Sequence, residues 1–480
     1  MKARLWNIRT LFIISMLIYI LSQVYTFYYG VRTLTGDGLG GDGARYAAWV
    51  MDKLSLSDYF QTLSAYHVQR ILPGIIVHYV MLLFHLDLQN HTAIIKTFLL
   101  FDNIMVTLTI IGLFSLARYL KWTAEATYIA FITLVFNFVI LKQMYHYTIL
   151  TDYTAFTLGF FQIYFYIKNQ NMYLYLTSLI GAFVWPTLLL TGLLMLIFKA
   201  DMFQKQTFNP SVDFYHKTKI WKILAVALLL SCISTIIFHF EQQNLYLYLS
   251  SYYAEAELLK QHFLFMPSLF VILLYASYIV LPFTLLFCSQ IFKKDNINKT
   301  LLINVAIAIC TYVAVTCLIH YLSDPALPKP ATFATFLLRP VYPVLAPGYS
   351  FIAYIPFFGL GTLLFIFLYT KMSFNLFSSI SAVTVLLLLI FFILEPEPRM
   401  TINYFPMVAI LLGAYLSQQK ISLSFCFYYA ALSYLFARAW LPNFYPYAPV
   451  PPYLHTGLIS IPIGMILLYA LIKKEGLYGK

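Results

Sequence analysis

TLFIISMLIYILSQVYTFYY, from Thr10 to Tyr29, is the stretch that decides the fold. It holds no charged residue, and about 20 predominantly apolar residues in a helix match the hydrocarbon thickness of a bilayer. Backbone polar groups inside lipid must be paired within the segment, which favours a helix. Lys2, Arg4 and Arg9 precede the run, and no small-x-small cleavage site follows it. We therefore predict an uncleaved first membrane span with its N-terminal end inside.

The composition of the whole chain agrees with this first span. Of 480 residues, 61% are hydrophobic and 10% are charged, and the mean hydropathy is +0.79. Soluble domains carry about 25% charged residues, so the solvent for most of this chain is lipid. The net charge of +12 lies mostly in short loops, and no basic stretch indicates a nucleic-acid partner. We predict an all-α, polytopic transmembrane helical bundle forming one domain over residues 1–480, with no separate soluble domain.

Further apolar runs predict about 13 to 14 spans in total. Two runs are ambiguous, because 71–86 is short for a span and 172–198 is interrupted by Trp185-Pro186. Either 71–86 lies in the membrane interface and 172–198 forms two short helices, or each crosses once. We favour the first solution, in which 31–93 is the first outer loop with interfacial helices. The candidate spans are 10–30, 94–118, 124–144, 148–168, 172–198, 221–240, 267–292, 299–322, 349–370, 376–394, 402–418, 423–440 and 457–473.

The first outer loop contains GDGLGGDG, from Gly36 to Gly43, with carboxylates at Asp37 and Asp42. The glycine spacing formally matches a dinucleotide fingerprint, but that motif needs a preceding strand, and here it follows a membrane helix. Calcium-binding glycine repeats occur in tandem arrays, which this chain lacks. Asp42 can simply cap the helix that the following residues predict. Alternatively, the glycines allow a ligand to approach the carboxylate closely.

A second motif in the same loop is YHVQRILPG, from Tyr66 to Gly74, in which Arg70 precedes a short apolar segment. Together with DGARYAA at 42–48 and QRILP at 69–73, this pattern resembles the C-type membrane glycosyltransferase superfamily, which includes protein mannosyltransferases and lipid A aminoarabinose transferases. Weaker resemblances are an acidic residue at the next outer turn, Asp152, and a late segment with Arg399 and Tyr404. Members of the superfamily use polyprenyl-phosphate-linked sugars and carry an essential Asp in the first outer loop.

The resemblance implies a chemistry for these residues. A carboxylate takes the proton of the acceptor hydroxyl or amine as it attacks the anomeric carbon, and cations stabilise the departing lipid phosphate. It implies Asp42 as the base, with Asp37 as its substitute. Groups that would bind the donor phosphate or substrate are Arg70, His67, Tyr46, Asp152, Arg339, Arg399 and Arg438. No cluster indicates a tightly bound metal and no cofactor is firmly implied, although a divalent cation is possible because some members need one.

Two other functions stay open at this stage. A transporter or lipid flippase would place charges in mid-span, and a polysaccharide polymerase or ligase would use a late outer loop such as 323–348 with Arg339. The expected partners are a polyprenyl-phosphate sugar donor, a lipid, glycan or protein acceptor, and membrane lipids. Lys and Arg in the short loops place both termini in the cytoplasm, and the absence of a eukaryotic retention signal favours a bacterial inner membrane.

Overall fold

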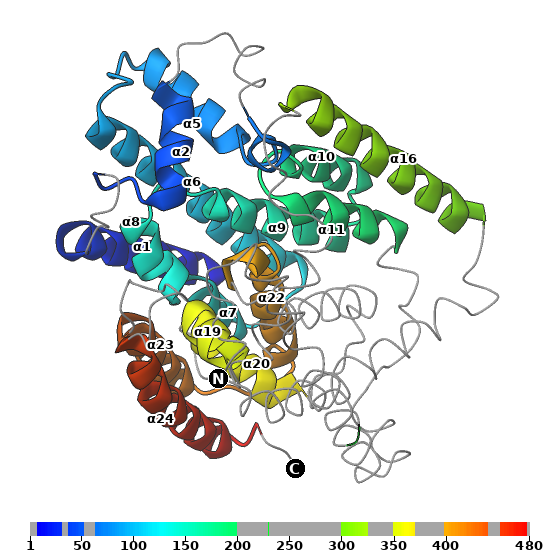
Figure 1. The fold of residues 1–480 in the computed structure, drawn as a ribbon. Helices are drawn as coiled ribbons and strands as arrows, with labels where there is room; N and C mark the ends of the chain where they lie inside the picture. Colours follow the sequence, from blue (N-terminus) through cyan, green and yellow to red (C-terminus); the bar gives the residue numbers. More distant parts are fainter. Residues whose placement is uncertain are drawn as a thin grey trace.

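Helices are the only regular elements in the part of the chain that the computed structural model describes, namely residues 7–30, 37–51, 63–198, 229, 299–324, 349–369, 398–439 and 452–477. The predicted all-α fold class is confirmed for these ranges. Figure 1 shows the arrangement, whose elements are α1 (Ile8–Tyr29), α2 (Gly41–Met51), α4 (Ala65–Val68), α5 (Leu72–Leu83), α6 (His91–Tyr119), α7 (Ala124–Val135), η1 (Val139–Gln143), α8 (Met144–His146), α9 (Asp152–Ile167), α10 (Asn171–Gly181), α11 (Pro186–Ile197), α16 (Lys299–Leu322), α19 (Tyr349–Phe358), α20 (Leu360–Tyr369), η7 (Pro398–Thr401), α22 (Phe405–Leu416), α23 (Leu423–Ala439) and α24 (Pro452–Glu475).

Three of these helices are long and apolar enough to cross a membrane: Ile8–Tyr29, His91–Tyr119 and Leu301–Leu322. A fourth crossing is added if Ala124–Val135 and Val139–His146, which meet at 50°, count as one bent span. The chain therefore has the helices of a membrane protein. The larger predicted number of about 13 to 14 spans stays a prediction, because the candidate spans 221–240, 267–292 and 376–394 lie almost entirely outside the described residues.

The first span, α1, matches the predicted run. Asn7 precedes it, and its side chain accepts a hydrogen bond from the Arg9 backbone at 3.1 Å, which satisfies an amide at the helix start. One face is buried against the protein, as Leu11 is 0% exposed, whereas Leu21 on another face is 66% exposed. An exposed stripe of large apolar residues on a long helix is the surface that lipid covers.

The predicted span 124–144 is broken rather than straight. Asn137 donates its amide to the carbonyl oxygens of Leu134 at 2.7 Å and Thr133 at 3.3 Å, and accepts from the Ile140 backbone at 3.0 Å. The side chain thus satisfies groups that the break removes from the helical ladder, and a π-helical turn, η1, follows. The bend carries the chain toward the turn at residues 147–151.

The centre of the described structure is formed by α7, α9 and α22, whose residues are almost all buried. Glycines allow the close packing: a methyl group on Gly159 of α9 would collide with the backbone of Asn403, just before α22. This contact fixes the segment that follows η7. Figure 1 shows α2 and α5 near one end of α6, and α23 and α24 side by side farther away.

The segment 172–198 forms two short helices, α10 and α11, as the favoured solution predicted. The chain turns at Ala182–Trp185, and Pro186 begins α11, where its missing amide costs no hydrogen bond. A methyl group on Gly181 would lie 2.7 Å from the Cβ of Leu188, so α10 and α11 fold back on each other as a hairpin. The hairpin places Trp185 at its tip.

The predicted first outer loop contains α2, α4 and α5 between the long helices α1 and α6. At 12 residues, α5 is about 18 Å long, which is too short to cross the hydrocarbon core alone. It packs against α2 and α6. Several later candidates are also shorter than expected. The run 349–370 is divided at Gly359, which has φ +75, and α22 has 12 residues where 402–418 was predicted to span.

Candidate functional site

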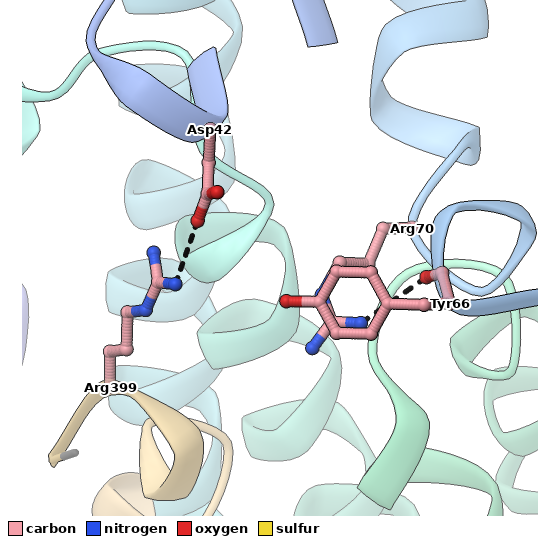
Figure 2. Close-up of polar contacts among 4 residues, drawn as sticks. All are labelled: Asp42, Tyr66, Arg70 and Arg399. Carbon is pink, nitrogen blue, oxygen red and sulfur yellow. Dashed lines mark hydrogen bonds and ion pairs between the residues drawn. The ribbon is translucent and has the colours of Figure 1, made fainter. Parts of the chain in front are cut away.

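An ion pair joins the region between α1 and α6 to a segment more than 350 residues later. Arg399 donates from Nη2 to Oδ2 of Asp42 at 2.7 Å, as Figure 2 shows. Asp42 lies in the first turn of α2, and Arg399 lies in the short helix η7. The Asp42 side chain is 38% exposed and that of Arg399 is 21% exposed. The pair is therefore held at the protein surface and remains accessible to a ligand.

Arg70 lies close to this pair on the turn between α4 and α5. Its guanidinium carbon lies 3.7 Å from the ring centre of Tyr66 and 4.6 Å from that of Trp185, and Nη1 donates to the Tyr66 carbonyl at 3.3 Å. Arg70 is only 2% exposed. Stacking on two rings lets a guanidinium stay buried without a carboxylate in direct contact. Figure 2 also shows the Tyr66 hydroxyl pointing toward the Asp42–Arg399 pair.

The α10–α11 hairpin fixes Arg70 in place. The indole nitrogen of Trp185 donates to the Met400 carbonyl at 3.4 Å, beside Arg399, and the Leu72 backbone donates to the Phe183 carbonyl at 3.0 Å. One tryptophan at the tip of the hairpin thus contacts both arginine-bearing segments. The predicted break at Trp185-Pro186 therefore has a structural purpose that the sequence analysis did not assign.

The electrostatics of the site favour an anionic ligand. Burial alone would raise the pKa of the Asp42 carboxyl, but the charge and hydrogen bond of Arg399, followed by the charges of Arg70 and Arg45, lower that pKa below its ordinary value. Asp42 is therefore ionised at neutral pH. Among the described residues, three guanidinium groups act on this one carboxylate, so their charges exceed that of Asp42.

Tyr46 and His67, both predicted site residues, lie beside the same group. Tyr46 is buried, and its ring centre lies 4.7 Å from that of Trp49. The Trp49 ring centre in turn lies 5.6 Å from that of His67. Burial raises the pKa of Tyr46 well above its ordinary value, so it stays protonated. Burial, with Arg45 and Arg70, lowers the pKa of His67, whose Nδ1 lies 2.9 Å from the hydroxyl of Ser64. A neutral imidazole is therefore favoured at pH 7.

Asp152, which the sequence analysis placed at an outer turn, begins α9 and is 1% exposed. The sequence analysis missed its neighbour Asp102, in the body of α6, which is 0% exposed and has no hydrogen-bond partner at either oxygen within the described residues. The two carboxyl groups act on each other electrostatically, and both act on Tyr153, as does Arg399. The signal was visible as the single acidic residue in the predominantly apolar run 94–118.

The other predicted residues lie elsewhere or outside the described ranges. Asp37 is an exposed turn residue with φ 53, and it forms no hydrogen bond or ion pair with another described residue. Arg438 lies at the end of α23, where it contacts α1 rather than Asp42. Arg339 is outside the described residues. Within the described ranges, no group of three or more His, Cys, Asp or Glu side chains is arranged to hold a metal ion.

Comparison of the chain with protein-family models, with curated proteins and with solved structures finds no match. The assignment of function therefore depends on the residues and geometry described above.

Proposed function

We propose that this chain is an inverting membrane glycosyltransferase that moves a sugar from a polyprenyl-phosphate-linked donor to an acceptor on the outer side of the membrane. One observation carries the proposal: Asp42 and Arg70, from separate helical segments between α1 and α6, meet Arg399, which lies more than 300 residues later, at one place in the fold. A carboxylate beside a cluster of arginines provides a proton acceptor and a cradle for a phosphate leaving group.

In the proposed reaction, the carboxylate of Asp42 accepts the proton of the acceptor hydroxyl or amine. The acceptor atom forms a bond to the anomeric carbon, and the bond from that carbon to the phosphate oxygen breaks. The electron pair stays on the polyprenyl phosphate, whose negative charge is stabilised by Arg399 and Arg70. Asp37 would serve as a base only if it moved, because it lies on an exposed turn.

Arg399 has two partners in this scheme. While it is paired with Asp42 it keeps the carboxylate ionised, but it also makes that carboxylate a weak base. An arriving phosphate competes for the same guanidinium and, by drawing Arg399 away, makes Asp42 more basic when the donor is bound. Arg70 is held between two rings and stays in place as the permanent cation.

The neighbouring groups support binding rather than proton transfer. Tyr46 and His67 lie beside Asp42 and Arg70, where a hydroxyl and a neutral imidazole can bond to sugar hydroxyls. Asp152, Arg339 and Arg438 have no assigned part in the transfer step. A divalent cation bound with the donor phosphate would share the negative charge with the arginines.

The test compares Asp42→Asn with Asp37→Asn in the purified full chain, using a panel of polyprenyl-phosphate-linked sugars as donors. Loss of a positioned base predicts a fall in rate of about 10²- to 10⁴-fold for Asp42→Asn. Asp37→Asn should retain the wild-type rate, because Asn adopts positive φ as readily as Asp. Full activity in both variants would overturn the assignment of the base.

The proposal also includes the finer membrane topology. We place the chain in a bacterial inner membrane with about 13 to 14 spans, both termini in the cytoplasm, and α2, α4 and α5 at the outer surface. Single cysteines introduced at positions 37 and 420 should be labelled by an impermeant reagent from opposite sides. Labelling of both positions from one side would overturn this orientation.

A second function, transport of a lipid or lipid-linked glycan, is favoured by one observation. Asp102 is a fully buried carboxyl group inside a membrane-spanning helix, and such groups often line a substrate or ion path. To distinguish the two functions, the wild-type chain and the Asp102→Asn variant are reconstituted in liposomes, and lipid translocation and sugar transfer are measured for both. Loss of lipid translocation would support a transporter, whereas an unchanged transfer rate with no translocation in the wild type would support the enzyme.

A further inference from the structure

A second cationic site lies around Arg438, near the ends of α1 and α23. The Arg438 guanidinium donates from Nη2 to the hydroxyl of Thr26, and its carbon lies 5.0 Å and 5.4 Å from the ring centres of Tyr25 and Tyr434. Among the described residues, its buried Nε has no hydrogen-bond partner and Arg438 forms no ion pair with an Asp or Glu. The guanidinium is therefore oriented, but no described residue supplies a counter-charge.

Lys142 places a second positive charge beside Arg438. Its Nζ donates to the carbonyl oxygen of Arg438 at 2.5 Å, and the two cations act on each other electrostatically. A second cation beside Arg438 strengthens the positive potential that an anionic ligand would meet there.

A buried amide with unmet hydrogen-bonding capacity lies beside these cations. Gln23 is 6% exposed, and neither its side-chain nitrogen nor its side-chain oxygen has a hydrogen-bond partner in the part of the chain that the structure describes. It lies one turn before Thr26 on the buried face of α1, and its backbone carbonyl accepts from Tyr145, on which Arg438 also acts. Buried polar groups in proteins are almost always bonded, so this amide is a further indication of a ligand.

We propose that Arg438, Lys142 and Gln23 form a binding site for the phosphate group of an anionic lipid, separate from the Asp42–Arg399 site. Thr26 orients Arg438 in this site, since its hydroxyl accepts from Arg438 and donates to the Ser22 carbonyl at 2.8 Å. Arginine presents several N–H donors in a fixed plane, which matches phosphate oxygens, and lysine adds a point charge. Thr26 lies near the end of the membrane-spanning helix α1, which is where a lipid headgroup is found. The inference does not rest on the proposed transfer reaction.

A carboxylate ligand is less suited to this site than phosphate. The donors come from three segments, α1, η1 and α23, and so approach the site from different directions. A tetrahedral phosphate presents oxygens in several directions, whereas a planar carboxylate presents two in one plane. The first site differs in this respect, because there Arg399 already forms an ion pair with a protein carboxylate, that of Asp42.

The experiment measures lipid bound to the full chain in neutral detergent by native mass spectrometry, with phosphatidylglycerol as the probe and phosphatidylcholine as the reference lipid. Arg438→Gln should weaken phosphatidylglycerol binding by about tenfold or more, as loss of a charge-assisted bond implies. Arg118→Gln is the matched control, since Arg118 is exposed near the end of α6 and should leave binding unchanged.

Inorganic phosphate added as a competitor identifies the source of the phosphate. Displacement of the lipid by inorganic phosphate supports a site that also takes free phosphate, and retention supports a site specific for lipid. Lys142→Gln is the second variant, and it should also weaken phosphatidylglycerol binding. Unfolding temperatures recorded for all the proteins show which variants fold, so Lys142→Gln provides the test if Arg438→Gln does not fold. Unchanged binding in the folded Arg438 or Lys142 variant, or an equal loss in Arg118→Gln, would overturn the proposal.

Discussion

Arg70 and Arg438 are held in the same way but have different neighbours. Each guanidinium lies over two aromatic rings and donates to a nearby oxygen, that of the Tyr66 backbone for Arg70 and that of the Thr26 hydroxyl for Arg438. Arg70 acts on the carboxylate of Asp42, whereas Arg438 acts on a second cation, Lys142.

The difference separates two kinds of chemistry. A carboxylate among arginines can accept a proton and then release its cations to a leaving group, so the Asp42 region is suited to catalysis. Arg438 forms no ion pair with a described Asp or Glu, so the Arg438 region is suited to binding an anion rather than to accepting a proton. The same kind of arginine substitution should therefore have different effects on activity and stability in the two regions.

The largest expected effect is on the transfer reaction. Arg399→Ala should lower kcat/KM by about 10²- to 10³-fold, because a preorganised cation at the leaving phosphate is lost. Arg438→Ala should leave kcat/KM close to the wild-type value when the assay contains saturating phosphatidylglycerol. The measurement is the initial rate with a polyprenyl-phosphate sugar donor. An equal fall in both variants would mean that the two regions form one site.

The second expected effect is on stability. Arg70→Ala should reduce the free energy of unfolding by about 2 kcal/mol, because it removes a desolvated cation–π stack between Tyr66 and Trp185. Arg438→Ala should cost less than about 1 kcal/mol, because its guanidinium is less buried and its removal relieves repulsion with Lys142. Unfolding in mixed micelles measures both. A larger cost for Arg438→Ala would contradict the comparison.

A smaller effect concerns pH. The pKa of Asp42 is lower in the folded chain than its ordinary value, so the pair with Arg399 stabilises the fold above the unfolded pKa of about 4. This contribution, about 0.5 to 1 kcal/mol for a partly exposed pair, is lost as pH falls through the folded-state pKa. The stability difference between wild type and Asp42→Asn should therefore shrink below about pH 4. A difference that is constant down to pH 3 would show that the pair contributes nothing.

Much of the fold could be predicted from local sequence. The long apolar runs at 10–30, 94–118 and 299–322 became α1, α6 and α16, because length and apolarity are properties of each segment alone. The break at Trp185-Pro186 was also predictable, since proline cannot continue a helix from its interior. The bend at Asn137 was not, because it depends on one side chain bonding to its own backbone.

The candidate site was predicted in its parts and not in its assembly. Asp42 and Arg70 were identified from the first loop, and Arg399 from a motif far along the chain. No local pattern shows that Arg399 contacts Asp42, or that Trp185 lies over Arg70, because these are tertiary contacts between distant segments. Asp102 was missed because a single acidic residue does not interrupt the apolar pattern by which the run 94–118 was identified as a span.

The smallest expected effect is the absence of coupling between the two regions. In a double-mutant cycle, Asp42→Asn and Arg399→Gln should be coupled by about 0.5 kcal/mol or more, because the two side chains share a hydrogen bond. Asp42→Asn and Arg438→Gln share no contact, so their effects on the free energy of unfolding should add to within about 0.3 to 0.5 kcal/mol. Coupling above that range would mean that the anion site at Arg438 communicates with the carboxylate. The proposed lipid site would then act as a regulator of transfer rather than as an independent anchor.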